Sequence, residues 1–371
     1  MHIGVPTEIK SDEDRVGLTP DSVAEVVAHG HEVTIQTGAG DGSGFPDVEY
    51  VGAGAEIAPD ADGVFAAAQL IVKVKEPQAV ERARLRPHHT LFTFLHLAPD
   101  PEQAEDLIAG ESSAIAYESV VGPHGGLPLL APMSQVAGRM AVQAGAHSLE
   151  SSSGGAGVLL GGVPGVPAAK VTVIGGGVVG RNSIEMAVGL GADVTVLDRD
   201  THVLETLADR FGPALRTVYA TRASTKAAVL ASDLVVGAVL VRGARAPKVV
   251  TADMVRDMRR GSVIVDVAID QGGCVETARP TTHADPTYVV DEVVHYCVAN
   301  MPGAVPRTST QALNNATLPY LIMLADHGPT AAMLADEGLR AGLTIHRGVV
   351  TEPAVAEALG RPYVSPEDAL G

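Results

Sequence analysis

The sequence predicts an α/β protein made of two doubly wound domains, and three observations support this fold class. The chain has 371 residues, which exceeds one ordinary hydrophobic core and favours two domains. Short apolar runs alternate with helical patterns along the chain, as they do in parallel βαβ units. A glycine-rich segment, GGGVVG at residues 175–180, lies between a β-branched run and a helical pattern.

The first 130 residues contain the elements of one parallel sheet. We expect strands in the apolar segments HIGVP, HEVTIQ, LIVKVK, TLFTFLH and AIAYES, and helices at residues 21–29 and 101–109. A long helix is expected over residues 132–154, with Ser134 as its N-cap. A loop rich in glycine and proline follows at residues 154–169.

The second half predicts a six-stranded sheet, one further long helix at residues 310–325, and a tail too short to form its own domain. The six strands are expected at residues 171–174, 194–197, 217–220, 234–240, 262–268 and 288–290. We expect the tail to fold back on the first domain. The predicted domains are residues 1–130 plus 306–371, and residues 131–305, joined by the two long helices with the active site in the cleft between them.

The glycine-rich segment has the context of a dinucleotide-binding turn. Gly175 suits the tight turn, Gly177 lets a pyrophosphate approach the backbone, and Gly180 lets the helix pack on the strand. Asp198 ends the next expected strand, where an acidic side chain binds ribose hydroxyls and disfavours a 2′-phosphate. This pattern predicts a Rossmann-like domain that binds NAD, whereas a glycine-rich turn without a ligand is the simpler alternative.

Composition excludes several classes of function. The net charge is −18 and there is no basic run, which argues against nucleic acid and anionic membranes as partners. There is no signal-peptide pattern and no uninterrupted apolar stretch of membrane-spanning length, so we expect a soluble, cytoplasmic protein. The two cysteines, Cys274 and Cys297, form neither a disulfide framework nor a zinc-site motif.

Polar side chains follow several of the expected strands at their carboxyl ends, where ligands bind in open α/β sheets. Lys75 and His96 end two strands of the first domain, and Asp270 follows a strand of the second. Arg15 lies in a loop after three acidic residues. Each has a simpler reading: Lys73 and Lys75 as a solvated strand edge, His96 as a capped or half-buried residue, Asp270 as a turn residue, and Arg15 as an ion-pair partner.

These four residue types share one chemistry. Arginine and lysine bind a substrate carboxylate. Histidine exchanges protons near neutral pH, which a hydride donor that carries an amine or hydroxyl requires. An aspartate near the nicotinamide orients water or stabilises a developing cation. These residue types are consistent with an oxidoreductase, although their positions alone do not decide against the simpler readings. The alternative class is a non-catalytic NAD(H)-binding protein, such as a transhydrogenase-type subunit.

The chain resembles the bacterial L-alanine dehydrogenases over nearly its whole length, on segments that include PTEIK, KVKEP, FTFLHLAPD, LPLLAPMSQVAGRM, VIVDVAIDQGG and LNNATLPY. The resemblance implies reversible oxidative deamination of L-alanine to pyruvate and ammonia with NAD, in a homohexamer. By the same resemblance Arg15 and Lys75 hold the substrate, His96 is the acid–base residue in hydride transfer from Cα, and Asp270 is its catalytic partner.

The resemblance also implies which residues line the dinucleotide. Besides the glycines Gly175 and Gly180, they are Ser134, Gly177, Val178, Asp198, Val239, Leu240, Ile269, Asn300 and Met301. Val203 and Ala220 replace residue types usual in the family on the adenosine side. Some family members carry a metal-binding pair on the late helix, but Met323 and His327 offer one ligand, so we expect no metal.

Overall fold

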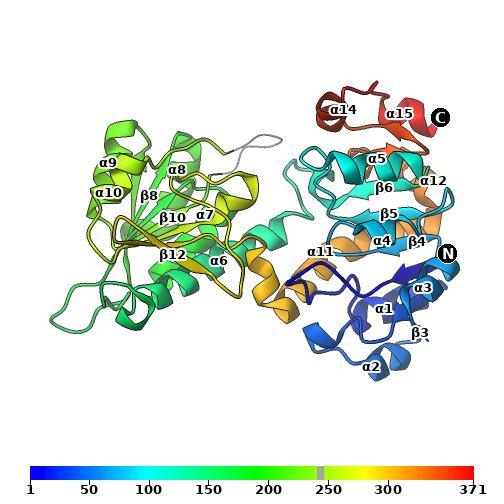
Figure 1. Ribbon diagram of the computed structural model, residues 1–371, viewed down its shortest axis with the longest axis horizontal. Helices are drawn as coiled ribbons and strands as arrows, with labels where there is room; N and C mark the ends of the chain where they lie inside the picture. Colours follow the sequence, from blue (N-terminus) through cyan, green and yellow to red (C-terminus); the bar gives the residue numbers. More distant parts are fainter. Residues whose placement is uncertain (240–245) are drawn as a thin grey trace. The chain divides into compact units, whose positions relative to one another are not determined.

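The computed structural model describes residues 1–239 and 246–371, which form two compact units (Figure 1). The first unit contains Met1–Met133 and Val305–Gly371, and the second contains Ser134–Ala304. Each unit is an α/β layer structure built on one twisted, mainly parallel sheet. The predicted fold class, two doubly wound α/β domains, is therefore confirmed.

The sheet of the first unit has eight strands in the order β15-β14-β6-β5-β4-β1-β2-β3. They are β1 (His2–Val5), β2 (Glu32–Gln36), β3 (Glu56–Ala58), β4 (Leu70–Val72), β5 (Thr90–Thr93), β6 (Ser113–Ala116), β14 (Leu343–His346) and β15 (Val349–Val350). Strands β1 to β6 run parallel, whereas β14 pairs antiparallel with β6 and β15 antiparallel with β14. The C-terminal segment thus adds two strands to the sheet that the N-terminal segment begins.

Helices surround this sheet, and several begin at recognisable caps. They are α1 (Pro20–Ala28), α2 (Asp47–Gly52), α3 (Ala61–Ala67), α4 (Ala79–Arg82), α5 (Pro101–Ala109), α11 (Pro306–His327), α12 (Pro329–Ala335), α13 (Glu337–Arg340), α14 (Pro353–Leu359) and α15 (Pro366–Leu370). Thr19 and Asp100 cap α1 and α5, each followed by a proline at the first helical position. In Figure 1, α14 and α15 lie at the end of the sheet that β14 and β15 form.

The sheet of the second unit has seven strands in the order β12-β13-β11-β10-β7-β8-β9. They are β7 (Lys170–Ile174), β8 (Asp193–Asp198), β9 (Leu215–Tyr219), β10 (Leu234–Gly237), β11 (Val263–Asp266), β12 (Thr287–Val290) and β13 (Val293–Tyr296). The helices are α6 (Ala131–Ser148), α7 (Val178–Gly189), α8 (Thr201–Phe211), α9 (Arg222–Ala231) and α10 (Ala252–Arg256). All neighbouring strands are parallel except β12, which pairs antiparallel with β13.

The prediction of six strands in this sheet is wrong at its edge. The expected last strand, at residues 288–290, is the antiparallel edge strand β12, and the parallel neighbour of β11 is β13, which was not predicted. Asp291 and Glu292 join the two strands with positive φ angles of 48° and 62°. Such two-residue hairpin turns usually contain asparagine or glycine, so this acidic pair gave no turn signal.

Three further expected elements, one helix and two strands, differ from the structure. The helix expected over residues 132–154 begins at Ala131 and ends at Ser148, so Ser134 lies inside its first turns and is not an N-cap. A 3-10 turn at Ser151–Ser153 and the left-handed Gly154 follow the helix. The strands expected in LIVKVK and TLFTFLH end at Val72 and Thr93, which leaves Lys75 and His96 three residues beyond the strands.

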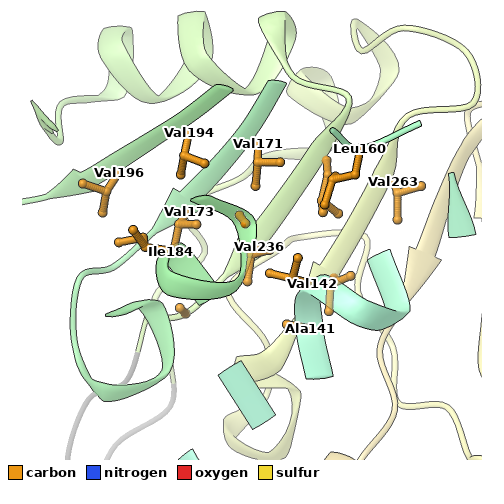
Figure 2. Close-up of a cluster of buried hydrophobic side chains, with 14 of the residues drawn as sticks. Ala141, Val142, Leu160, Val171, Val173, Ile184, Val194, Val196, Val236 and Val263 are labelled. Carbon is orange, nitrogen blue, oxygen red and sulfur yellow. The ribbon is translucent and has the colours of Figure 1, made fainter. Parts of the chain in front are cut away.

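The core of the second unit lies between its sheet and the helices α6 and α7 (Figure 2). Valines from four adjacent parallel strands point toward these helices, as expected for a sheet that is covered on both faces. The side chains labelled in the figure are Ala141, Val142, Leu160, Val171, Val173, Ile184, Val194, Val196, Val236 and Val263. This core fixes the carboxyl end of β7, from which the glycine-rich turn departs.

Candidate active site

The glycine-rich turn has the geometry that the sequence predicts for a dinucleotide site. Gly175 has φ +99°, and a Cβ atom there would lie 2.6 Å from the carbonyl oxygen of Ala238. A Cβ atom on Gly180 would lie 1.8 Å from the carbonyl oxygen of Gly175. Gly177, by contrast, faces open space and precedes α7 without a capping side chain. The turn therefore presents a helix N-terminus with room for a phosphate group.

Replacing Gly180 with alanine should damage both this turn and dinucleotide binding. The new Cβ forces the backbone of Gly175 to move, and we expect a loss of about 1–3 kcal/mol of stability. Gly189→Ala is the control, because a Cβ at that position of α7 meets nothing within 4 Å. We expect the control to gain about 0.4–1 kcal/mol. Thermal unfolding and NADH fluorescence titration measure both effects, and equal NADH affinity in the two variants would contradict the prediction.

Asp198 joins the end of β8 to the glycine-rich turn. Its Oδ2 accepts a hydrogen bond from the N–H of Gly176 at 2.6 Å, and its Oδ1 accepts from Asp200 at 2.9 Å. Val203 lies beside the same turn, because a Cβ on Gly176 would come within 2.6 Å of its Cγ1 atom. The N–H of Ala220 donates to the carbonyl oxygen of Asp198 at 2.8 Å. Val203 and Ala220, the two positions singled out on the expected adenosine side, thus lie near Asp198.

The other predicted dinucleotide-lining residues lie near the carboxyl ends of the central strands or at the start of a helix. Val178 is the first residue of α7, Val239 follows β10, and the buried Ile269 lies in a 3-10 turn after β11. Met301 is buried and begins a second 3-10 turn, Met301–Ala304. Leu240 lies outside the described residues.

Asp270 and Asn300, thirty residues apart in sequence, are brought together by the fold. Asp270 is exposed in the 3-10 turn Val267–Gln271, and its Oδ1 accepts a hydrogen bond from the N–H of Asn300 at 3.3 Å. Asn300 has φ +58°, and its carbonyl oxygen accepts from His283 at 3.1 Å. The left-handed residue at position 300 therefore aims a backbone donor at the predicted catalytic carboxylate.

In the first unit, Arg15 is almost fully buried at 2% exposure and pairs with Glu13. Its Nε donates to Glu13 Oε1 at 2.6 Å, and its Nη1 donates to the sulfur of Met133 at 3.0 Å. The ion pair that the sequence left open is thus present. Because Glu13 is itself buried, the pair fixes the plane of the guanidinium group in a defined orientation.

Lys73 is not part of a solvated strand edge, and that reading of the sequence is wrong. Its side chain is fully buried, and its Nζ lies 3.0 Å from Glu8 and 2.8 Å from Glu81. Burial opposes the charge of Lys73, but the two carboxylates outweigh this effect and raise its pKa. Since β4 ends at Val72, strand alternation does not extend to Lys75, which is only half-buried.

The backbone of Lys75 is held by hydrogen bonds to Glu8, a member of the buried ion cluster, and to Thr93. Glu8 Oε1 accepts from the N–H of Val74 at 2.7 Å and from that of Lys75 at 3.4 Å. The carbonyl oxygen of Lys75 accepts from the hydroxyl of Thr93 at 3.0 Å, at the end of β5. The segments that follow the neighbouring strands β4 and β5, and that carry Lys75 and His96, therefore lie side by side.

His96 is held in a left-handed conformation by a carboxylate that the sequence analysis did not identify. Its φ is +49°, and the N–H groups of Leu95 and His96 donate to Glu118 at 3.2 and 2.6 Å. The imidazole stacks on Phe94, with 4° between the ring planes, and its Nδ1 lies 3.7 Å from Glu118. The ring is 48% exposed, so it is oriented by these contacts and remains accessible to a substrate.

A second carboxyl group near Glu118 should make stability depend on pH. Burial is the main reason why the pKa of Glu352 lies above its ordinary 4.5, and the charge of Glu118 adds to the effect. A raised folded pKa means that the stabilisation is complete below the ordinary pKa and is lost as pH rises through the folded value.

Glu352→Gln should therefore raise the melting temperature relative to wild type at about pH 8 but not at about pH 4. The amide oxygen of the glutamine still accepts the hydrogen bond from Ser119. Thermal unfolding at both pH values tests this, with Glu357→Gln, at an exposed position of the helix α14 that Glu352 precedes, as the control. The same difference from wild type at both pH values would refute it.

The described residues contain no group of three histidine, cysteine, aspartate or glutamate side chains arranged to hold a metal ion. Among the helices that the structure describes, none is long and apolar enough to cross a membrane.

A glycine-rich turn at a helix N-terminus in one unit, with a histidine and a lysine just beyond two parallel strands of the other, is the pattern of an α/β dehydrogenase. More particularly, the chain belongs to the alanine dehydrogenase/PNT family. Its residues 4–137 match the N-terminal domain of that family, and residues 141–353 match the C-terminal domain.

Individual relatives support the same assignment. An alanine dehydrogenase from Halomonas elongata is 58% identical over 371 residues, which is all of both chains. A solved L-alanine dehydrogenase superposes with a TM-score of 0.94 at 51% identity, over 97% of this chain and 99% of that one. A transhydrogenase structure from Sinorhizobium meliloti gives a TM-score of 0.81 at 25% identity, over 95% and 100% of the two chains.

Proposed function

We propose that the protein catalyses the reversible oxidative deamination of L-alanine to pyruvate and ammonia, with NAD as the hydride acceptor. The observation that carries this proposal is the 58% identity to an alanine dehydrogenase over the full length of both chains. In this proposal, residues 1–130 plus 306–371 form the substrate domain, and residues 131–305 form the NAD-binding domain.

The residues around the glycine-rich turn fit a dinucleotide. Open space at Gly177 and the uncapped start of α7 suit the pyrophosphate, and the carboxylate of Asp198 suits the ribose hydroxyls. Val178, Val239, Leu240, Ile269 and Met301, with Ser134 and Asn300, would complete the site. When bound, NAD supplies a hydride acceptor for the hydrogen on the substrate Cα.

The chain's own residues would bind and deprotonate the substrate. Arg15, whose guanidinium plane is fixed by Glu13, and the half-buried Lys75 would hold the carboxylate of alanine. His96 would accept a proton from the substrate ammonium group and release it to solvent, because histidine changes charge near neutral pH. After hydride transfer it would accept a proton from the water that attacks the imine and donate that proton to the nitrogen. The nitrogen would then leave as ammonia while the hydroxyl group loses its proton to His96 and becomes the carbonyl of pyruvate. Asp270 would face the reacting carbon and stabilise the positive charge that develops there.

The reaction has a simple test of stoichiometry. Purified protein with L-alanine and NAD should release pyruvate, ammonium and NADH in equal amounts, and pyruvate with ammonium should consume NADH. A panel with glycine and 2-aminobutyrate in the same assay defines the pocket, since one methylene is worth about 1–3 kcal/mol. The absence of NADH formation with every amino acid would reject the proposal.

Cofactor choice should depend on Asp198. Asp198→Asn keeps an oxygen acceptor for the N–H of Gly176 but removes the charge that repels a 2′-phosphate. We expect the ratio of kcat/KM for NAD to that for NADP to fall by about tenfold or more, as a loss of about 1.4 kcal/mol of discrimination would produce. Asp200→Asn, two residues away at the N-cap of α8, should leave the ratio unchanged. An unchanged ratio in Asp198→Asn would show that this carboxylate does not select the cofactor.

A transhydrogenase-type subunit is the second candidate function, and one specific observation favours it: the fold similarity to the transhydrogenase structure. The lower identity of that match, 25% against 51% for the L-alanine dehydrogenase structure, makes it the weaker candidate. Such a subunit would bind NADH without oxidising it when pyruvate and ammonium are added.

We also propose that the protein is a cytoplasmic homohexamer, as the family resemblance implies. Leu159, Val163 and Val166 are 66%, 53% and 60% exposed in the loop that precedes β7, and a second copy of the chain would cover them. Light scattering should give six times the chain mass of 38.0 kDa, and cell fractionation tests the location.

A further inference from the structure

We propose that Asp266 is a positioning residue that holds the loop carrying Asp270 in its working conformation. This loop, residues 267–275, is called the Asp270 loop below. The inference rests on the proposed catalytic role of Asp270, which Asp266 would support without touching the substrate.

A single buried carboxylate ties both ends of the Asp270 loop to the sheet. Asp266 is the last residue of β11 and is fully buried. Its Oδ1 accepts from the N–H of Ala268 at 3.1 Å, at the start of the loop. Its Oδ2 accepts from the N–H groups of Cys274 and Val275 at 2.9 and 3.0 Å, where the loop returns. The thiol of Cys274 also donates to Oδ1, at 3.4 Å.

Glycines lie next to this carboxylate at positions where a side chain would collide with it or with Cys274. Gly272 and Gly273 turn the loop with φ angles of +87° and +74°. A Cβ atom on Gly273 would lie 2.7 Å from Asp266 Oδ2. A Cβ atom on Gly237, at the end of β10, would lie 2.4 Å from the sulfur of Cys274 and 3.2 Å from Asp266 Oδ1. Gly273 is therefore required by the approach of the loop to Asp266, and Gly272 by its left-handed backbone conformation.

The hydrogen-bond donors around position 266 require a side chain with two acceptor oxygens. Burial raises the pKa of Asp266, while the three backbone N–H groups and the Cys274 thiol stabilise the charged form. An asparagine has one acceptor oxygen, so its NH₂ group would face N–H donors in either orientation of the amide. Buried donors left without an acceptor cost about 1–3 kcal/mol each, so the asparagine variant should open the loop.

Opening the loop would move Asp270, which lies four residues after Asp266 and accepts a hydrogen bond from Asn300. A displacement of about 1 Å at a reacting group can cost about 100-fold in rate. Asp266 would therefore control turnover through geometry, leaving the substrate contacts of the first unit intact.

The test compares three asparagine variants of the intact protein. Asp266→Asn should lower kcat for alanine by about 30- to 100-fold, with KM within about threefold, and should speed amide hydrogen exchange in residues 267–275. Asp270→Asn should lower kcat without that change in exchange. Asp233→Asn is the matched control. Asp233 directly precedes β10 of the same sheet, and its buried carboxylate accepts a hydrogen bond from the backbone N–H of Lys170 at 2.8 Å. Its kcat should stay within about twofold of wild type.

The outcomes separate this inference from the proposed function. Unchanged exchange in residues 267–275 of Asp266→Asn, or a kcat like that of Asp233→Asn, would overturn the positioning role. Wild-type turnover in Asp270→Asn, with faster exchange in Asp266→Asn, would reject the role of Asp270 and keep the structural role of Asp266. Should Asp266→Asn fail to fold, Gly273→Ala perturbs the same carboxylate from the loop side, and the same two measurements decide.

Discussion

Replacing His96 with alanine should lower kcat for alanine oxidation by about 10²- to 10⁴-fold, the range expected for loss of a general acid–base group. NADH affinity should remain within a few-fold of wild type, because the glycine-rich turn proposed to bind the dinucleotide lies in the other unit. Steady-state kinetics and NADH fluorescence measure the two quantities. Added imidazole should restore part of the rate, since it can replace the missing base.

His88→Ala is the matched control for this variant. His88 is also exposed and lies on the same stretch of chain, but before β5 instead of after it. Because the amino end of a parallel strand lies away from the ligand-binding edge, the control should retain wild-type turnover. Wild-type turnover in His96→Ala would reject the assignment of this residue.

Replacing Lys73 with alanine should produce the largest loss of stability, about 3–5 kcal/mol, because it leaves Glu8 and Glu81 buried without their cation. The unfolding transition of the first unit, followed with heat and with denaturant, measures this loss of stability. Lys226→Ala is the control: its ion pair with Asp257 is half-exposed and should be worth less than about 1 kcal/mol.

A compensated variant separates charge from packing at this cluster. The triple variant Lys73→Met, Glu8→Gln and Glu81→Gln removes all three charges and keeps similar side-chain volumes. It should recover most of the stability that Lys73→Ala loses. Equal unfolding midpoints for Lys73→Ala and Lys226→Ala would show that the buried cluster contributes no more than a surface pair.

The local pattern of the sequence was sufficient to predict the central part of the second unit's sheet. The order of strand, glycine-rich turn, helix and strand appears at β7, α7 and β8, where the apolar residues and glycines predicted it. Gly180 shows why: no other residue fits within 1.8 Å of a backbone oxygen. The strand β13 was not predictable in this way, because the hairpin turn that joins it to the edge strand β12 uses Asp291 and Glu292 in left-handed conformations.

The candidate site shows the same contrast between local and long-range information. Polar residues after strands could be selected from sequence, since strand direction fixes the ligand-binding edge. Their partners could not, because Glu118 lies 22 residues from His96 and Glu8 lies 65 residues from Lys73. The backbone donor of Asn300 that reaches Asp270 carries no side-chain signal at all.

The most direct test of the proposed chemistry follows the hydrogen on the substrate Cα. With L-alanine deuterated at Cα and ordinary NAD, the NADH formed should carry the deuterium, and kcat/KM should show a primary isotope effect when chemistry limits the rate. NADH without deuterium, or no NADH from L-alanine, would contradict direct hydride transfer from alanine to the dinucleotide.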